Sequence, residues 1–276
     1  MTNNRDHDSG SAAPAVLLAC FLFLLVIATV YIFIARPWPP PPPITSIGAQ
    51  VDQQYNLTLC VTGAVFILSQ IGLGYAVFRF RDRGQRARFI RGSKILEILW
   101  TLATAVLFLG LGIVGRKAWA ENRLLRPDAG AIEIEVTESQ FVFNFRYAGP
   151  DGKFGRIDPA QISPSTGNPL GIDQNDRAGR DDIVVPALTV PVNCNIELLI
   201  RSQDVVHNFY VRELRLQQDA VPGIVAPVRF TADKIGTYEI VCTQLCGMGH
   251  HQMRSFLHVV SRSDYESFLQ QHAVSP

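Results

Sequence analysis

The first 120 residues contain three long stretches in which apolar positions dominate and charged positions are nearly absent. These stretches are Ala15–Ala35, Leu57–Phe78 and Ile95–Val114, and one acidic residue, Glu97, lies near the start of the third. A helix rises 1.5 Å per residue, so about 20 residues cross the roughly 30 Å of hydrocarbon in a bilayer. The pattern therefore predicts three transmembrane helices.

The pattern changes after Glu121, where short runs of β-branched and aromatic residues alternate with clusters of Gly, Pro, Asn and Asp. This alternation predicts an all-β sandwich or barrel of about 140 residues. A polar stretch from Gly149 to Asp182 predicts a long surface excursion, and Asp264–His272 predicts a short terminal helix. The predicted strands are Ile132–Val136, Phe141–Tyr147, Ile183–Val190, Ile196–Ile200, Asn208–Val211, Val228–Thr231, Tyr238–Val241 and Phe256–Val260.

We expect three regions along the chain. Residues 1–56 form an extra N-terminal transmembrane helix and an external loop, Arg36–Gln54, that Pro39–Pro43 stiffens. Residues 57–119 form a transmembrane hairpin with a basic cytoplasmic loop, and residues 120–276 form an extracytoplasmic β domain.

Charge determines the predicted orientation. The net charge of +1 is the sum of two opposite halves. Residues 1–119 carry 11 basic and 5 acidic side chains, a net charge of +6, and residues 120–276 carry 14 and 19, a net charge of −5. Seven basic residues and only Asp82 as an acid lie between the second and third apolar stretches, and such loops stay in the cytoplasm. The C-terminal domain is therefore expected outside the cytoplasm, and nothing in the charge favours nucleic-acid binding.

An N-terminal apolar stretch can also be a cleaved signal peptide. Signal peptides have a basic start and an apolar core of about 7–15 residues. Here Arg5 is offset by Asp6 and Asp8, and the apolar run is longer, so we expect a retained anchor. The segment before Cys20 partly resembles a lipoprotein cleavage box, but most of the apolar run follows Cys20.

The chemistry is concentrated in a short segment near the end of the β domain. Cys242, Cys246, His250 and Met253 lie within 12 positions, and His207 lies 35 positions before Cys242. Two thiolates, two imidazoles and a thioether are soft ligands that suit copper. A disulfide would explain only the cysteine pair, structural zinc has no use for Met, and a mononuclear blue-copper site uses one Cys. A site with two coppers would use both thiolates as bridges.

The segment resembles the binuclear copper A domain in subunit II of the haem-copper oxidases, the cytochrome c oxidase family. Asp204–Phe209 is similar to the segment around the family's first His ligand, and Asp219–Gly223 to the turn after it. Lys94–Thr101 is similar to the start of the family's second membrane helix, and Gln140–Phe145 to its entrance to the β domain. The resemblance implies a cupredoxin-like Greek-key sandwich behind an α-helical membrane anchor of three transmembrane helices.

The resemblance also implies two copper ions and six groups that hold them. Two thiolates bridge the coppers, one histidine binds each copper, and two weaker ligands lie on opposite coppers: Cys242, Cys246, His207, His250, Met253 and the backbone carbonyl of Gln244. His251 competes with His250, but the step of four positions from Cys246 matches the family. We therefore expect His251 to face solvent or a partner subunit.

By the same resemblance, the chain receives single electrons from cytochrome c and passes them to haem in a separate subunit I, which reduces oxygen to water. It would be subunit II of an oxidoreductase in the bacterial inner membrane, with its C-terminal domain in the periplasm. Glu97 would lie at the cytoplasmic entrance of a proton path. Alternatives are the same relay in a nitric oxide reductase, a quinol oxidase subunit without copper, and a membrane-anchored copper-delivery protein. The intact ligand set argues against the last two.

The sequence departs from the family at two places that bear on function. Phe141 and Phe143 stand where the family often has Trp, and an exposed Trp there is the usual point at which the electron enters. Electron entry at Phe141 and Phe143 is therefore expected to differ in detail, or else the donor itself differs. Gln244 replaces a Glu that helps to hold magnesium in the family, so the resemblance is not extended to that metal. These departures suggest a divergent bacterial branch.

Overall fold

The computed structural model describes residues 12–81, 83, 89, 91–123 and 130–273. The chain divides into two compact units. One comprises the chain up to Pro40 together with Gln53–Ile113, and the other comprises Pro41–Asp52 together with Val114–Pro276. Several charges that entered the predictions lie outside the described residues: Arg5, Asp6, Asp8, Asp82, Arg86 and Arg88.

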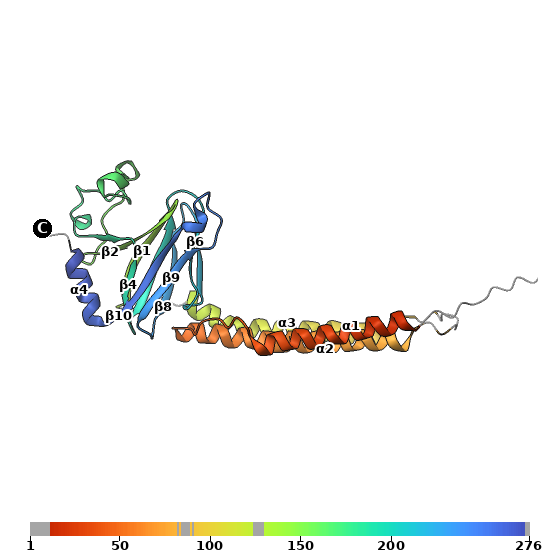
Figure 1. Cartoon of the computed structure of the whole chain (residues 1–276). Coiled ribbons are helices and arrows are strands. Elements are labelled where there is room, and N and C mark those ends of the chain that lie inside the picture. The colour runs from red at the N-terminus through yellow and green to blue at the C-terminus, as the bar shows by residue number, and fades with distance from the viewer. Residues whose placement is uncertain (1–11, 82, 84–88, 90, 124–129, 274–276) are drawn as a thin grey trace, which may run out of the picture. The chain divides into compact units, whose positions relative to one another are not determined.

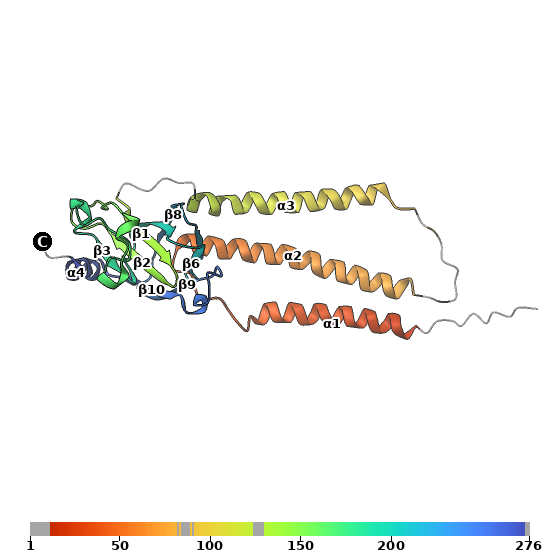
Figure 2. The ribbon, with the colours of Figure 1, turned by 90° about the horizontal axis from the view of Figure 1, so that it is seen from above.

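The first unit is built from three long helices, α1 (Ala13–Ala35), α2 (Ser46–Arg79) and α3 (Lys94–Arg123), of which the last two extend beyond it (Figures 1 and 2). Each is long and apolar enough to cross a membrane, which confirms the three predicted spans. Most of their large apolar side chains are exposed, as expected for surfaces that face lipid.

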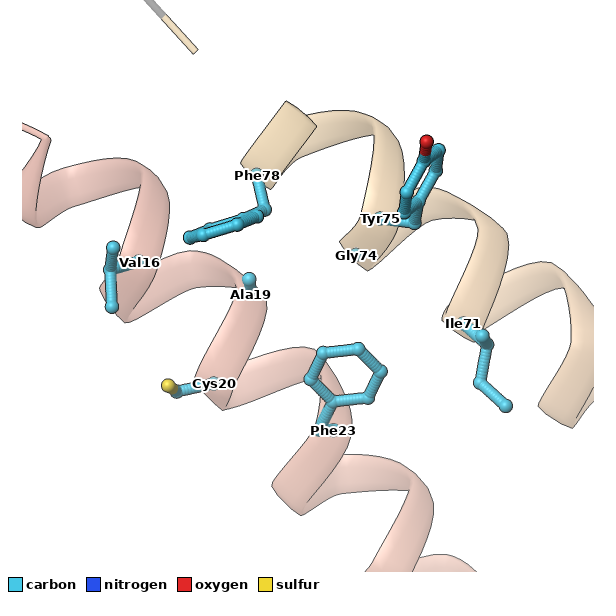
Figure 3. A pocket seen from close by; sticks show the side chains of 8 residues that line it. All are labelled: Val16, Ala19, Cys20, Phe23, Ile71, Gly74, Tyr75 and Phe78. Atoms are coloured by element: carbon cyan, nitrogen blue, oxygen red, sulfur yellow. The ribbon is translucent and has the colours of Figure 1, made fainter. Parts of the chain in front are cut away.

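The helices α1 and α2 pack through small residues. The Phe23 ring lies over Gly74, where an added Cβ would come within 3.2 Å of the ring (Figure 3). Ala19 is buried on the same face of α1. Beside this contact, the two helices line an apolar cavity of about 410 Å³ that ends at Phe78. Small residues at a close approach are typical of helix packing within membranes.

The helix α2 begins well before its apolar run, so the external loop predicted over Arg36–Gln54 is shorter than expected. The Thr45 side chain accepts a hydrogen bond from the Gly48 backbone N–H at 2.8 Å and caps the helix that starts at Ser46. This start was not predicted, because polar residues are frequent in the first turns of α2. Of the predicted loop, only residues 36–45 lie outside the helices.

The second unit is a sandwich of two five-stranded sheets, as predicted (Figures 1 and 2). One sheet has the order β3 (Ile183–Val185), β2 (Val142–Tyr147), β1 (Ile132–Ser139), β5 (Asn195–Ser202) and β8 (Ala226–Thr231). The other has the order β4 (Leu188–Pro191), β10 (Arg254–Val260), β9 (Gly236–Cys242), β6 (His207–Val211) and β7 (Leu216–Ala220).

Alternate residues of the strands fill the space between the sheets. Ile134 and Val136 of β1 are fully buried, and Phe143 of β2 meets Phe209 of β6 edge to face with ring centroids 6.4 Å apart. Burial of these side chains removes a large apolar area from water and is the main stabilising contribution to the domain. Because Phe209 belongs to the same strand as His207, this core also holds one candidate ligand.

Two strand predictions were wrong in detail. The run Ile183–Val190 is not one strand, because Pro186, which has no N–H, separates β3 from β4, and these strands pair in different sheets. The strand β7, Leu216–Ala220, was not predicted. It is an edge strand whose two ends are buried while Gln217, Gln218 and Asp219 between them are polar, so its sequence lacks an apolar run.

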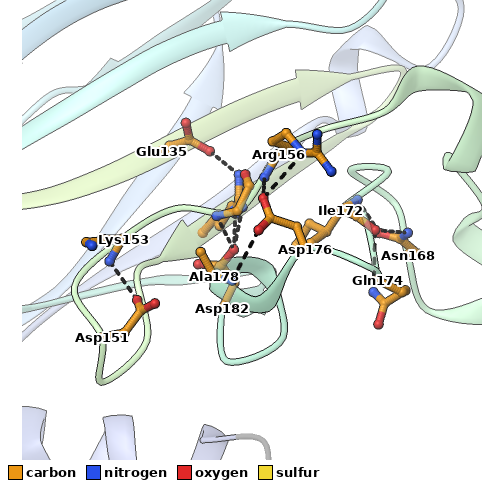
Figure 4. A network of polar contacts seen from close by, with 12 residues as sticks. Glu135, Asp151, Lys153, Arg156, Asn168, Ile172, Gln174, Asp176, Ala178 and Asp182 are labelled. Carbon is orange, nitrogen blue, oxygen red and sulfur yellow. Dashed lines mark hydrogen bonds and ion pairs between the residues drawn. The ribbon is translucent and has the colours of Figure 1, made fainter.

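The excursion between β2 and β3 is held down by buried charge. It contains the short helices η1 (Pro159–Gln161), η2 (Pro164–Thr166) and η3 (Arg177–Gly179). Arg146 of β2 is 1% exposed and forms ion pairs with Glu135, at 2.9 Å, and with Asp182 (Figure 4). Its Nη2 also donates a hydrogen bond to the Gly155 carbonyl at 2.6 Å. A polar segment is thereby fixed to the sheet by a buried ion-pair network, in which Asp182 Oδ1 has no hydrogen-bond partner among the described residues.

Residues Pro41–Asp52, which we term the strap, pack against the β domain. The Ile44 backbone N–H donates to the Glu213 carbonyl at 3.0 Å, and its carbonyl accepts from the Asp233 N–H at 2.9 Å. Arg215, in the turn between β6 and β7, donates to both carboxylate oxygens of Asp52, at 2.7 and 2.9 Å. Ile44 is 2% exposed and joins the hydrophobic core, so the strap is an integral part of the domain.

The chain ends in the predicted terminal helix, α4 (Arg262–His272). The Ser261 side chain accepts a hydrogen bond from the Asp264 backbone N–H and caps this helix. Phe268 meets Tyr147 of β2 with ring centroids 5.5 Å apart, which docks α4 on the sandwich.

Candidate metal centre

Two neighbouring strands and the segment that joins β9 to β10 bring the candidate ligands together. His207 is the first residue of β6 and Cys242 the last of β9, and these strands pair so that Phe209 lies opposite Cys242. The Cys242 backbone N–H donates to the Met253 carbonyl at 3.2 Å. Residues 243–252 therefore form a loop, here termed the ligand loop, whose two ends hold Cys242 and Met253 side by side.

Three strong metal ligands converge at this point. The ligand atoms of His207, Cys242 and Cys246 all lie within 4.8 Å of one another, and all three residues are buried. The two sulfur atoms are 3.8 Å apart and are free thiols. A pair of adjacent thiols with a histidine beside them is a soft donor set that copper prefers.

The remaining predicted ligands surround the same two sulfur atoms. Cys246 Sγ lies 3.6 Å from His250 Nδ1 and 3.9 Å from Met253 Sδ. Cys242 Sγ lies 3.2 Å from the Gln244 carbonyl oxygen. All six groups implied by the sequence motif therefore meet in one place.

The ligand loop reverses tightly so that its second half returns to the sulfurs. Gly247 has a φ of +141°, which side-chain-bearing residues rarely adopt. The His250 backbone N–H donates to the Gly247 carbonyl at 3.1 Å and begins the short helix η4 (His250–Gln252). This turn directs His250 toward Cys246 and leaves His251 exposed, as the spacing suggested.

His207 is oriented by a hydrogen bond to a carboxylate. Its ring is 0% exposed, and Nε2 lies 2.7 Å from Asp204 Oδ1. An ionised carboxylate only accepts hydrogen bonds, so Nε2 carries the hydrogen and Nδ1 bears the lone pair. Nδ1 is buried and has no hydrogen-bond partner within the described part of the chain. A buried acceptor without a partner is costly, and a bound metal ion would satisfy it.

The electrostatics of the site are consistent with a bound cation. Burial and the neighbouring Cys242 thiol both raise the pKa of the Cys246 thiol. Burial also tends to raise the pKa of Asp204, but hydrogen bonds from Gln140, His207 and Val205 outweigh it and lower that pKa. The site thus combines a thiol, Cys246, that needs a nearby positive charge to ionise with a carboxylate that is already ionised. The residues present fit copper.

The two phenylalanines expected where the electron enters lie in different places. Phe143 is 2% exposed and belongs to the hydrophobic core, so it offers no surface to a partner protein. Phe141 is half-buried and covers the ligand loop, because a Cβ added to Gly249 would lie 2.5 Å from its ring. A role in electron entry stays a prediction for both residues, and of the two only Phe141 is partly exposed.

Glu97 lies in the other unit, in the first turn of α3, and its side chain is exposed. The Thr101 hydroxyl donates to its backbone carbonyl at 2.8 Å. Its expected role in a proton path remains a prediction.

Sequence reasoning included Gln140 and Asp204 in the family motif but assigned them no contact with the site. Asp204 lies three positions before His207, and this short spacing could have indicated the hydrogen bond between their side chains. No local signal existed for Gln140, whose side chain reaches the Cys246 carbonyl 106 positions away.

Comparison with known proteins gives a consistent result. Residues 176–260 match the family model described as "Cytochrome C oxidase subunit II, periplasmic domain". The chain is 35% identical over 224 residues to the alternative cytochrome c oxidase subunit 2 of Bradyrhizobium diazoefficiens, covering 80% of this chain and 79% of the relative. It is 29% identical over 237 residues to cytochrome c oxidase subunit 2 of Cereibacter sphaeroides, covering 82% and 77%. The crystal structure of the periplasmic domain of subunit II of cytochrome oxidase of Bradyrhizobium japonicum is 25% identical, covering 53% of this chain and 96% of that one, with a TM-score of 0.39.

Proposed function

Because the chain belongs to the cytochrome c oxidase subunit 2 family, we propose that it receives single electrons from cytochrome c and passes them to haem in subunit I, which reduces oxygen to water. The relatives support an electron-receiving role in a haem-copper oxidase. The observation that carries the finer proposal is the convergence of six donor groups, two of which are adjacent thiols.

The donor set favours two coppers over one. A mononuclear blue-copper site uses one thiolate, two histidines and a weak axial ligand. Here a second thiol, Cys246, lies 3.8 Å from Cys242, and the Gln244 carbonyl adds a sixth donor. Two coppers bridged by both thiolates would supply a one-electron redox couple in which a shared electron changes each bond length little.

The residues of the chain hold this centre and keep water from it. His207, Cys242, Cys246 and Met253 are all buried, and His250 is half-buried. Asp204 fixes the orientation of the His207 ring through its 2.7 Å hydrogen bond. A rigid ligand set keeps the reorganisation on electron transfer small, because the groups around the metal do not move.

The donor is proposed to approach over Phe141, whose half-buried ring lies against the ligand loop. Residues 120–276 carry a net charge of −5, which suits a basic donor such as cytochrome c. Charges further apart than about 8–10 Å are largely screened at physiological ionic strength, so this attraction affects the association rate more than the final contact.

The protein is membrane-anchored, with an extracytoplasmic β domain. The proposed location is the bacterial inner membrane, with the β domain in the periplasm and subunit I as the partner that accepts the electrons. Glu97, at the start of α3, is proposed to lie at the cytoplasmic entrance of a proton path. The relatives reported above are oxidase subunits and do not favour the alternative relay in a nitric oxide reductase.

The proposal can be tested on the full chain, purified in detergent and loaded with copper. An electron shared equally by two copper nuclei gives a seven-line hyperfine pattern in low-temperature EPR spectra, whereas a single copper gives four lines. We expect the seven-line pattern in the wild type and in Cys194→Ser, and its loss in Cys246→Ser. A four-line pattern in the wild type, or no bound copper, would contradict the proposal.

A further inference from the structure

Gln140 contacts both segments that carry the candidate ligands. It lies in the turn between β1 and β2, and its backbone N–H donates to Asp204 Oδ2 at 2.7 Å. Its side-chain Nε2 donates to the Cys246 carbonyl at 2.6 Å. One residue thus joins the segment before His207 to the ligand loop, although its two partners lie 64 and 106 positions away.

The hydrogen bond from Gln140 to Asp204 is linked to a candidate ligand. Asp204 accepts from Gln140 on Oδ2 and lies 2.7 Å from His207 Nε2 on Oδ1. A continuous chain of hydrogen bonds therefore runs from the His207 ring, through Asp204 and Gln140, to the peptide that follows Cys246. Gln140 itself is no candidate ligand, because its amide nitrogen donates to a carbonyl.

The ligand loop is shaped to receive Gln140 and the residue after it. A Cβ added to Gly247 would lie 2.8 Å from Gln140 Nε2, so the missing side chain of Gly247 leaves the space that the amide occupies. The Phe141 ring covers Gly249 in the same way, with 2.5 Å to an added Cβ. The turn between β1 and β2 and the ligand loop therefore fit each other at two neighbouring glycines.

We propose that Gln140 is a positioning residue for the copper centre: it fixes the ligand loop relative to the His207 segment and thereby sets the spectrum, the reduction potential and the retention of the bound copper. This inference rests on the proposed function, because it assumes that copper binds at these ligands. Gln140 acts through Asp204 and Cys246 and touches no copper itself. Residues that orient ligands from outside commonly change metal affinity about 10–100-fold when replaced.

The test removes only the hydrogen bond from the Gln140 side chain to the Cys246 carbonyl. Gln140→Met has a similar length but no amide, and its backbone N–H can still donate to Asp204. In the copper-loaded full chain, we expect the variant to release copper to a chelator about tenfold faster than the wild type. We also expect a shifted visible absorption band and a changed reduction potential, neither of which a general loss of stability would produce.

Gln203→Met is the matched control. Gln203 is exposed in the loop before His207, and its side chain donates to the Pro169 carbonyl. We expect this variant to keep the wild-type spectrum, potential and release rate. If Gln140→Met fails to fold, Gln140→Asn takes its place, since it keeps the amide but shortens its reach.

A variant at position 140 that folds and matches the wild type in spectrum, potential and copper release would overturn the inference. Equal changes in Gln203→Met would overturn it as well, because the effect would not be specific to Gln140. Failure of the proposed function is distinguishable, since it would appear in the wild type as an absent or four-line copper signal.

Discussion

Asp204 and His207 form a hydrogen bond of 2.7 Å between a carboxylate oxygen and Nε2 of the imidazole. The opposite nitrogen, Nδ1, is buried and lacks a hydrogen-bond partner among the described residues. The carboxylate therefore fixes both the tautomer of His207 and the direction of its free lone pair.

Replacing Asp204 with Ala should weaken copper binding. The ring of His207 would lose the acceptor that fixes its tautomer, so we expect a loss of about 10–100-fold in copper affinity, measured by competition with a chelator. Glu239→Ala removes an exposed carboxylate of β9 that pairs with Arg254, and it should leave the affinity unchanged. Equal affinity in Asp204→Ala and the wild type would show that the hydrogen bond does not orient the ligand.

The adjacent histidines of the ligand loop should behave differently. His250 Nδ1 lies 3.6 Å from Cys246 Sγ, whereas His251 is exposed. His250→Ala should abolish the seven-line EPR pattern, and His251→Ala should keep it. The opposite result would assign the ligand to His251.

A methyl group at Gly249 should displace Phe141. The Gly249 φ of −91° suits any residue, so the effect of Gly249→Ala is steric and comes from the 2.5 Å approach to the ring. We expect a destabilisation of about 1–3 kcal/mol in thermal unfolding of the copper-free protein. Combining it with Phe141→Ala should remove most of that cost. An additive double variant would mean that the two positions do not touch.

Glu138 should make the β domain less stable as the pH rises. Its side chain is 0% exposed, neither carboxylate oxygen has a hydrogen-bond partner within the described residues, and burial together with Asp219 raises its pKa to about 9. The folded state thus keeps the proton between about pH 4.5 and 9, where the unfolded state loses it, so stability declines over that window. Glu138→Gln should flatten this decline and stabilise the domain by a few kcal/mol near pH 8, as measured by thermal unfolding. An unchanged pH profile would contradict the assignment.

The strap should contribute measurably to the stability of the β domain. Arg215→Met removes the paired hydrogen bonds to Asp52 and a third to the Pro41 carbonyl, so we expect a loss of about 2 kcal/mol in thermal unfolding. Arg212→Met is the matched control, because Arg212 is exposed and its side chain pairs with its neighbour Glu213. Similar unfolding temperatures for both variants would mean that the strap is not a stabilising part of the domain.

The parts of the structure that depend on local sequence could be predicted. The spans follow from the lengths of apolar runs, and five of the six candidate ligand groups lie in one short segment, on the ligand loop or at its two ends. Phe141 and Phe143 were treated alike, but only Phe143 lies in β2 and points into the core, while Phe141 precedes the strand. The strand β7 was missed because an edge strand need not be apolar. The Gln140 contacts and the strap depend on pairing between distant segments, which leaves no local pattern.

The strap also constrains how the molecule can be assembled. Asp52 and Arg215 are separated by 163 positions, and Lys234 donates to the Pro43 carbonyl across 191. Since synthesis begins at the N-terminus, Ile44 and Asp52 cannot form their contacts with the β domain until that domain has been synthesised and exported. If only one helix of the α2–α3 hairpin crossed the bilayer, the strap and the β domain would face opposite compartments. Their pairing is therefore possible only in chains in which both helices of this hairpin cross the bilayer or neither does.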